Sequence, residues 1–200
     1  YQFDFAVDIG AASGDWGYAL ASKLKVPTIW CFEPSDEFFI PTLIGVFPYF
    51  LRRQISMKNA AITNTNDKCF LIFKEGGKRL RYRSFISTEI LEGQEGKIIE
   101  TTSLRTFNAN LSGQGLLKID VEGGELNVLK SGDADFFRKI ACIVFEFNDD
   151  EDAQMFTSIE RILEDFGFTI YTVQGEHITR IDTSNLSRRS SVNLMALKNV

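Results

Sequence analysis

Three acidic side chains share one pattern in this sequence, because each lies at the end of an apolar run that predicts a buried β-strand. They are Asp8, Glu33 and Asp120. The carboxyl ends of parallel strands meet at one edge of an open α/β sheet, and ligands bind in the crevice beyond that edge. We therefore expect the three carboxylates to lie close together around a binding site.

A tight turn follows the first of these strands, with Gly10 and Gly14 on either side of three small residues. Gly10 allows the chain to change direction sharply, and Gly14 lets the next helix begin close to the sheet. The small residues between them leave room for a ligand against bare backbone. Asp8, just before the turn, can accept hydrogen bonds from loop amides or from a cationic ligand.

Glu33 ends the next strand, where an acidic group can bind both hydroxyls of a ribose. A glycine-rich turn followed by an acid at the end of the next strand is found both in sites for NAD and in sites for S-adenosyl-L-methionine (SAM). The turn lacks the middle glycine of G-x-G-x-x-G, which allows close approach to a pyrophosphate. SAM has no phosphate, so the pattern favours SAM over a dinucleotide. The alternative is a tight turn that binds nothing, with Glu33 as a solvated strand end.

The most informative segment is Leu117–Glu125, with the sequence LKIDVEGGE. A buried strand ends in Asp120, and an acid-Gly-Gly-acid turn opens a helix. Lys118 interrupts a strand that should be buried on both faces, and a buried lysine is costly unless it is paired. Asp120 or Glu146 could pair with it.

Apolar runs alternate with helical segments, which predicts βαβ units and a parallel sheet. The predicted strands are Phe5–Ile9, Thr28–Phe32, Ile55–Ile62, Leu116–Val121, Ile140–Phe147, Phe168–Val173 and Val192–Leu197, with the last two antiparallel to each other. The predicted helices are Asp15–Leu24, part of Asp36–Arg53, Gly123–Lys130, and a segment from the acidic run Asn148–Asp152 to about Phe166. The less regular stretch Asp67–Glu100 is interpreted as a hairpin or flap.

The composition is that of one soluble globular domain, with 200 residues, 44% of them hydrophobic and 24% charged. No segment has the roughly 20 apolar residues that a membrane helix needs, and no signal peptide is visible. Phe3–Ile9 already predicts a buried strand, so we expect an N-terminal portion to precede Tyr1.

The net charge indicates which binding partners are disfavoured, and the cysteines indicate the cellular compartment. The formal net charge of −5 argues against nucleic acid as the main partner. The basic cluster Lys78–Arg83 is interpreted as a solvated hairpin or loop, with an anion-binding lid as the alternative. Cys31, Cys69 and Cys142 lie far apart in the sequence, which indicates buried thiols in a reducing compartment and a cytoplasmic location.

The chain resembles the FkbM-like family of SAM-dependent methyltransferases. KIDVEGGE is the specific part of this resemblance, and the other pieces support it by their order and spacing. One departure is Ala12, where the family usually carries an asparagine, and the helices common before the first strand are absent. The matching pieces are Val7–Gly14, Cys31–Pro34, Asn59–Ile62, Thr102–Leu104, Leu117–Leu129 and Ile143–Glu146.

The resemblance implies a Rossmann-like class I methyltransferase fold with SAM as cofactor. Such a fold has a mostly parallel seven-stranded sheet with an antiparallel C-terminal hairpin and helices on both faces. By this resemblance, Asp8, Gly10 and Gly14 hold the methionine end, Glu33 the ribose hydroxyls, and Asn59 and Ala60 flank the adenine. Family acceptors are typically hydroxyls of sugars, glycolipids or polyketide-like small molecules. The full set of expected cofactor contacts is Asp8, Gly10, Ala12, Gly14, Glu33, Pro34, Asn59, Ala60 and Asp120.

Methyl transfer from a sulfonium is an in-line displacement that mainly requires alignment, and a general base helps when the acceptor is an alcohol. We expect Asp120, between cofactor and acceptor, or Glu122 to be that base. Lys118 would position a carboxylate or the acceptor oxygen. The alternative is that Lys118 and Asp120 form only a structural pair and that Glu122 only caps its helix.

Metal chemistry has less support. Glu146, Asp120, Asn148 and Asp149 could hold a divalent cation through oxygen ligands, but such residues more often begin a helix, so no metal site is predicted. His177 is the only histidine, and together with the scattered cysteines it argues against a zinc site. A solvated turn is its expected place, and a catalytic base is the second choice.

Two other functions remain open. An NAD(P)-dependent oxidoreductase of the short-chain type would carry a Tyr-x-x-x-Lys pair, which none of the five tyrosines forms. A non-catalytic module that keeps the fold is the other alternative. The acceptor is expected to be set by Asp67–Glu100, by the link around His177 and by whatever precedes Tyr1. Phe38, Phe39, Phe47 and Tyr49 are interpreted as core residues, or alternatively as the border of an apolar pocket.

Overall fold

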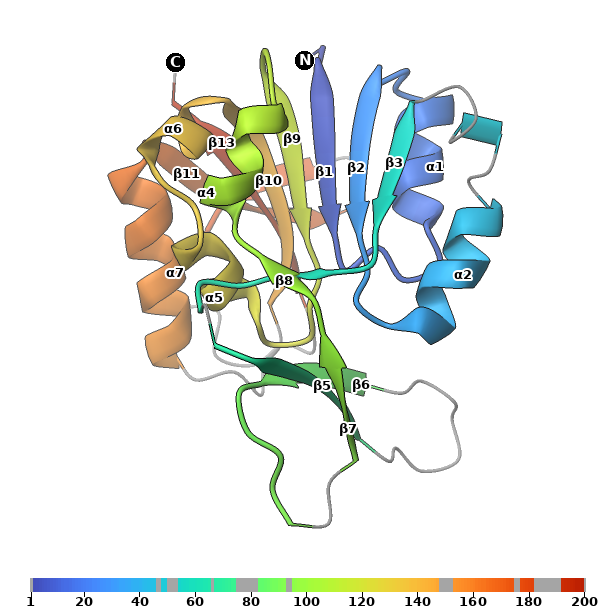
Figure 1. The fold of residues 1–200 in the computed structure, drawn as a ribbon. Helices are drawn as coiled ribbons and strands as arrows, with labels where there is room; N and C mark the ends of the chain where they lie inside the picture. The colour runs from blue at the N-terminus through green and yellow to red at the C-terminus, as the bar shows by residue number, and fades with distance from the viewer. Residues whose placement is uncertain are drawn as a thin grey trace.

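The computed structural model has an eight-stranded sheet at its centre (Figure 1). The strand order across this sheet is β12-β11-β13-β10-β9-β1-β2-β3. The structure describes residues 2–45, 48–49, 54–65, 67–74, 83–92, 95–147, 153–174, 177–181 and 192–199. The strands of the central sheet are β1 Phe5–Ile9, β2 Thr28–Phe32, β3 Ile55–Lys58, β9 Gly115–Ile119, β10 Ile140–Phe147, β11 Phe168–Gln174, β12 His177–Arg180 and β13 Val192–Lys198.

The direction of the strands confirms the predicted fold class. Strands β3, β2, β1, β9 and β10 run parallel, whereas β13 is antiparallel to both β10 and β11. Seven of the strands therefore form the predicted mostly parallel sheet with its antiparallel C-terminal pair. The eighth strand, β12, pairs only with β11 at the edge, and exposed His177 begins it rather than lying in a turn.

Side chains alternate between the two faces of the sheet, and along the central strands both sets are apolar. Helices therefore cover both faces. On β1, Phe5, Val7 and Ile9 join one apolar cluster and Ala6 joins the other. The first cluster includes residues of α4, α5, α6 and α7, and the second includes residues of α1. The helices are α1 Asp15–Ser22, α2 Asp36–Gly45, α4 Leu104–Phe107, α5 Glu125–Lys130, α6 Ala134–Arg138 and α7 Ala153–Asp165, with the 3-10 turn Asn108–Asn110 after α4.

The predicted third strand proved to be two separate strands. The strand β3 ends at Lys58, and after Asn59 and Ala60 the chain forms β4, Ala61–Ile62, which pairs in parallel with β8, Thr101–Thr102. The side-chain amide of Asn59 donates to the backbone oxygen of Glu33 at 3.3 Å and holds this crossing at the end of β2. An apolar run alone does not show that a strand changes partners, so the sequence could not reveal this break.

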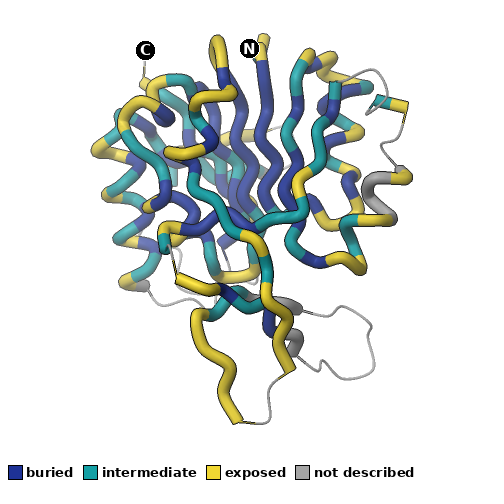
Figure 2. The backbone as a smooth tube through the Cα atoms, viewed as in Figure 1, coloured by how far each residue is buried: buried dark blue, intermediate teal, exposed yellow. Residues whose placement is uncertain are grey.

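The stretch between β4 and β8 forms a small sheet of its own, with the order β6-β5-β7. Its strands are β5 Cys69–Lys74, β6 Arg83–Ser87 and β7 Gly96–Ile99, all paired antiparallel. The predicted hairpin is thus confirmed with a third strand added; residues 78–82 of the basic cluster lie outside the described residues. Figure 1 shows this sheet beyond the carboxyl ends of the central strands, and Figure 2 shows its mostly exposed far end.

Two further sequence expectations concern the core and the membrane. The three cysteines are buried and free, as predicted. Among the helices of the described residues, none has the length and apolarity needed to cross a bilayer.

Candidate functional site

A cavity of about 460 Å³ lies at the carboxyl ends of the parallel strands. Turns after β1, β2 and β9 form most of it, and the small sheet contributes one wall. This is the sheet edge at which the sequence predicts a binding site. The lining residues are Ile9, Gly10, Ala12, Ser13, Phe32, Glu33, Pro34, Phe38, Ala60, Ala61, Ile62, Leu71, Ile86, Asp120, Val121, Glu122 and Glu146.

The predicted site residues fall into two groups in the structure. Those that line the cavity are Gly10, Ala12, Glu33, Pro34, Ala60, Asp120 and Glu122. Asp8, Gly14, Asn59 and Lys118 are not among the lining residues. Of these four, Asp8, Asn59 and Lys118 form contacts that hold the cavity-lining turns in place, so any effect of these three on a ligand passes through the residues that they hold.

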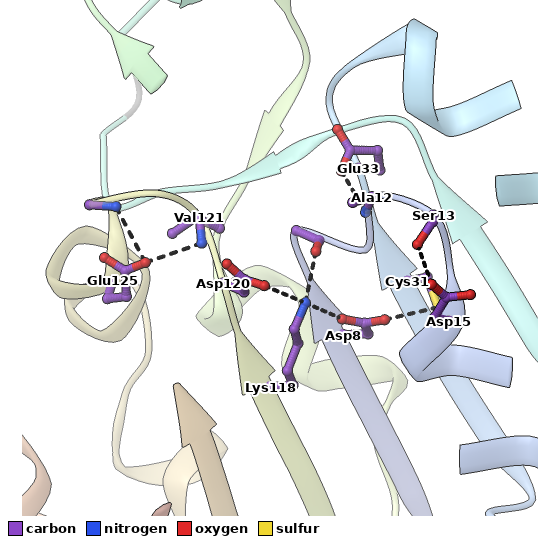
Figure 3. Close-up of polar contacts among 12 residues, drawn as sticks. Asp8, Ala12, Ser13, Asp15, Cys31, Glu33, Lys118, Asp120, Val121 and Glu125 are labelled. Carbon is purple, nitrogen blue, oxygen red and sulfur yellow. Dashed lines mark hydrogen bonds and ion pairs between the residues drawn. The ribbon is translucent and has the colours of Figure 1, made fainter. Parts of the chain in front are cut away.

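Lys118 is the centre of this support (Figure 3). Its Nζ donates to the backbone oxygen of Gly10 at 2.8 Å and lies 3.1 Å from Asp8 Oδ1 and 3.5 Å from Asp120 Oδ2. The side chain of Lys118 is 9% exposed and that of Asp8 is 0% exposed, whereas that of Asp120 is 40% exposed. The ammonium thus connects a fully buried carboxylate, the glycine turn and a carboxylate that reaches the cavity.

The electrostatics keep Lys118 charged. Burial by itself lowers the pKa of its ammonium, but the charges of Asp8 and Asp120 outweigh that effect and raise the pKa. A lysine ammonium has three N–H donors, and three acceptors surround this one. This arrangement favours the role of positioning a carboxylate over that of binding the acceptor oxygen.

The two turns that carry the sequence signatures are in direct contact. Asp120 N donates to Ile9 O at 3.0 Å. Gly10 has φ +75°, and a Cβ added there would lie 1.8 Å from the backbone oxygen of Asp120. Only glycine fits such an approach in a left-handed conformation. Ala12 also has a positive φ, of 40°, and asparagine tolerates that conformation better than alanine, which gives a physical reason for the family's usual residue there.

Glu33 lines the cavity while it stabilises the turns beside it. Its Oε2 accepts from Ala12 N at 2.9 Å and its Oε1 from Ser35 N at 2.8 Å. Burial raises the pKa of this carboxyl, and the two amides and the Lys118 charge offset only part of the rise. Each carboxylate oxygen has a second lone-pair site, so Glu33 can still accept hydrogen bonds from a ligand.

The role of Glu125 did not follow from the sequence, although the residue belongs to the LKIDVEGGE motif. Glu125 is buried, and its Oε1 accepts from Val121 N at 3.1 Å and from Gly123 N at 3.4 Å. These bonds hold the turn that presents Val121 and Glu122, the latter with φ +54°. An acid in the first turn of a helix usually indicates a favourable charge at the helix N-terminus, so its sequence position alone did not reveal this inward contact.

The structure brings Glu146 to the cavity, together with Asp120 and Glu122. Asn148 and Asp149 of the possible cation site lie outside the described residues. Within the described part of the chain, no three His, Cys, Asp or Glu side chains converge on a metal position. His177 does not line the cavity.

One wall of the cavity is apolar and comes from Phe38, Leu71 and Ile86. Phe38 was among the aromatic residues considered for such a pocket. Tyr49 instead packs edge-to-face on Tyr18, with ring centroids 5.5 Å apart, and Phe47 lies outside the described residues. Leu71 and Ile86 were not singled out by the sequence, because their approach depends on how the small sheet folds back.

Comparison with known proteins gives a family and a fold. A family model described as the methyltransferase FkbM domain matches residues 8–170. The solved structure of methyltransferase FkbM from Methylobacillus flagellatus KT aligns with a TM-score of 0.60 and 14% identity. That alignment covers 98% of this chain and 44% of the other, so this chain spans less than half of that protein.

Two further structures share the fold. One is a precorrin-6y C5,15-methyltransferase from Geobacter metallireducens GS-15, with a TM-score of 0.51, 13% identity, and coverage of 99% of this chain and 80% of that one. The other is a precorrin 8w decarboxylase from Methanobacterium thermoautotrophicum, with a TM-score of 0.51, 12% identity, and coverage of 99% and 83%. Such identities show a common fold alone. None of the curated protein sequences matches the chain.

The Lys118 cluster leads to a prediction about stability. Replacing Lys118→Met leaves the buried Asp8 carboxylate without its ammonium, so the free energy of unfolding at about pH 7 should fall by about 3–5 kcal/mol. Without the ammonium, Asp8 binds a proton more readily in the native state, so part of the loss should be recovered as the pH decreases. Urea denaturation at several pH values measures both effects.

Lys139→Met is a matched control for that experiment. Among the described residues, Lys139 Nζ donates to the backbone oxygens of Asn108 at 3.1 Å and Leu111 at 2.8 Å and to no carboxylate, so its removal leaves no described carboxylate unpaired. Its cost should be smaller and should not diminish at low pH. Equal costs for the two variants, both independent of pH, would contradict the assigned role of Lys118.

The buried carboxyl of Glu125 leads to a prediction about pH dependence. Burial raises its pKa above the usual range, and the turn amides offset only part of this rise. The native state therefore holds the proton more tightly, and this contribution to stability is lost as the pH rises from about 4 through the raised pKa. Glutamine does not titrate, so Glu125→Gln lacks this pH-dependent contribution. The stability of the variant relative to the wild type should therefore increase as the pH rises through this range.

Glu125→Ala serves as the comparison. It removes the acceptor of both turn amides, so it should lower the free energy of unfolding by about 1–3 kcal/mol at every pH tested. If the difference in the free energy of unfolding between the wild type and Glu125→Gln stayed constant from about pH 4 to about pH 7, the raised pKa of Glu125 would be wrong.

Proposed function

The chain belongs to the FkbM methyltransferase family and is a SAM-dependent methyltransferase, and we propose that it methylates a hydroxyl oxygen on a sugar, a glycolipid or another small molecule. One observation carries the proposal for a hydroxyl acceptor. Asp120, which Lys118 holds at 3.5 Å, lines a cavity whose lining also includes other carboxylates and a set of apolar side chains.

The residues around the cavity fit SAM. Gly10 presents bare backbone to the cavity. The cavity volume of about 460 Å³ lies within the range of small-molecule sites. Glu33 lines the cavity with acceptor oxygens that suit ribose hydroxyls. We assign the methionine end to the turn at Gly10 and Ala12 and the adenine to Pro34 and Ala60. In this assignment, Asp8 and Gly14 support the turn, and Asn59 fixes the end of β2.

The chemistry divides between cofactor and chain. SAM supplies a methyl group on a positively charged sulfur. The chain must align the acceptor oxygen and receive its proton. Asp120 suits this task because its contact with Lys118 uses Oδ2 and leaves Oδ1 to accept the proton. Glu122 lines the same cavity and is the second candidate for the base.

The lining of the cavity supports a small amphiphilic acceptor. The apolar wall of Phe38, Leu71 and Ile86 suits the body of such a molecule. Carboxylates from Asp120, Glu122 and Glu146 can accept hydrogen bonds from its hydroxyls. The same carboxylates and the net charge of −5 disfavour a nucleic acid, whose phosphates they would repel.

The strand order weighs against the dinucleotide-binding alternative. The dinucleotide-binding fold has the order 3-2-1-4-5-6. Here β13 inserts antiparallel between β10 and β11. This arrangement, the missing middle glycine and the family match all favour SAM over NAD(P).

We also propose that residues 1–200 act as one methyltransferase domain of a cytoplasmic protein. Strands from both ends of the chain belong to one sheet, which supports a single unit. The free, buried state of Cys31, Cys69 and Cys142 fits a reducing compartment.

Calorimetry and product analysis test the proposed function. SAM and S-adenosylhomocysteine should bind, and NAD should not. With SAM present, a panel of sugars and hydroxylated lipids should yield S-adenosylhomocysteine, whereas the matched deoxy compounds should not. Binding of SAM without turnover across the panel would indicate a non-catalytic module, and turnover only with amines would overturn the hydroxyl assignment.

A conservative change at Asp120 tests the general base. Asp120→Asn keeps the size of the side chain but cannot take a proton, so the rate of methyl transfer should fall by about 10²–10⁴-fold. SAM affinity, measured by calorimetry, should change little. Glu122→Gln should slow transfer less. A wild-type rate in Asp120→Asn would refute the assignment, and a larger loss in Glu122→Gln would move the role to that residue.

A further inference from the structure

A second cavity, of about 350 Å³, lies beside the first. The chain around β4 connects them, because Ala61 and Ile62 line the first cavity and Thr63, the next residue, lines the second. The remaining walls come from β8, from the start of α4 and from the end of α5 (Figure 1). None of the proposed cofactor or acceptor contacts lies in this second cavity.

The lining of the second cavity is polar throughout. Every lining residue carries a hydroxyl, an amide or a positive charge, and the two charges are those of Arg105 and Lys130. No carboxylate is among the lining residues of the described chain. Sites for neutral organic ligands are lined mainly by apolar groups, so this composition fits a small charged group with many acceptor oxygens.

Several of these polar groups are not used within the described structure. Thr63 is 5% exposed, yet its hydroxyl forms no hydrogen bond with any described residue, and neither do those of Thr101 and Thr102. Ser103, by contrast, already accepts from Thr106 N at 3.1 Å as the cap of α4. The unused hydroxyls and the Lys130 ammonium are therefore available to a ligand.

Arg105 is oriented from outside the cavity. Its Nε lies 3.5 Å from Asp133 Oδ2, and Asp133 Oδ1 accepts from Phe136 N as the cap of α6. The contact uses Nε and leaves the paired Nη donors, which suit two oxygens of one anion. Asp67 accepts from the hydroxyl of the lining residue Thr65 at 2.8 Å and does not itself line the cavity.

We propose that this second cavity binds a phosphate group, either inorganic phosphate or the phosphate of a phosphorylated small molecule. Arg105 and Lys130 supply charge, and the hydroxyls of Thr63, Thr101 and Thr102 donate to the remaining oxygens. The site shares no lining residue with the neighbouring transfer cavity, whose carboxylates would repel a phosphate group. In a chain with a net charge of −5, the described lining of this cavity carries two positive charges and no carboxylate.

Calorimetry with sodium phosphate, against sodium chloride at equal ionic strength, tests the site. Phosphate should bind to the wild type, and Arg105→Gln and Lys130→Gln should each weaken binding by about tenfold or more. Thr63→Val should also weaken it, because only the hydroxyl is lost. Arg138→Gln is the matched control, since Arg138 is exposed, pairs with Asp135 and does not line the cavity.

Two further ligands separate the sources of the phosphate. Tighter binding of glucose 6-phosphate than of inorganic phosphate would indicate a phosphorylated molecule, and equal binding would indicate a simple anion site. The proposal would be overturned if the wild type did not bind phosphate, or if the double variant Arg105→Gln, Lys130→Gln bound phosphate as tightly as the wild type. It would also be overturned if unphosphorylated glucose bound as tightly as glucose 6-phosphate. SAM binding by each variant shows that the variant is folded. Phosphate binding is measured without a methyl acceptor, so its outcome does not depend on the proposed hydroxyl acceptor.

Discussion

The arrangement of the site depends on one buried ammonium that must remain paired. The register of the parallel pair β1 and β9 places Lys118 directly beside Asp8 in the middle of the sheet. Burying a charge is tolerated only with a counter-charge and hydrogen bonds, and here they come from two strands and one turn. Because the ammonium also binds the Gly10 carbonyl, the turn after β1 and the carboxylate after β9 are held in a fixed relation.

The acidic residues near the sheet edge divide into two kinds by the direction of their contacts. Asp8, Glu33 and Glu125 are buried. Asp8 forms an ion pair with Lys118, and the other two accept hydrogen bonds from backbone amides, so all three shape the turns. Asp120 and Glu122 line the cavity, where a ligand can reach them. Glu33 belongs to both kinds, since it lines the cavity as well. The inward contacts thus pre-organise the groups that face the ligand, which lowers the cost of aligning reactants.

Sequence reasoning reached the convergence of Asp8, Glu33 and Asp120 because the ends of parallel strands must meet at one edge. The cost of burying a charge predicted that Lys118 is paired, with Asp120 as one of the expected partners. The nearer carboxylate, that of Asp8, was not among the expected partners. The departure of the chain at Asn59 and the approach of Leu71 and Ile86 did not follow, because they depend on pairings between strands far apart in sequence. Glu125 was missed for a different reason, since a carboxylate that begins a helix usually faces solvent.

The way the small sheet joins the molecule has an evolutionary consequence. The excursion leaves after β4 and returns at β8, and these two strands are direct neighbours in a parallel pair. Its two ends are therefore close in space, and the loop can change length at little entropic cost. The residues of this excursion, and with them the cavity lining at Leu71 and Ile86, can therefore be exchanged in evolution without moving the turns after β1, β2 and β9 that form most of the cavity.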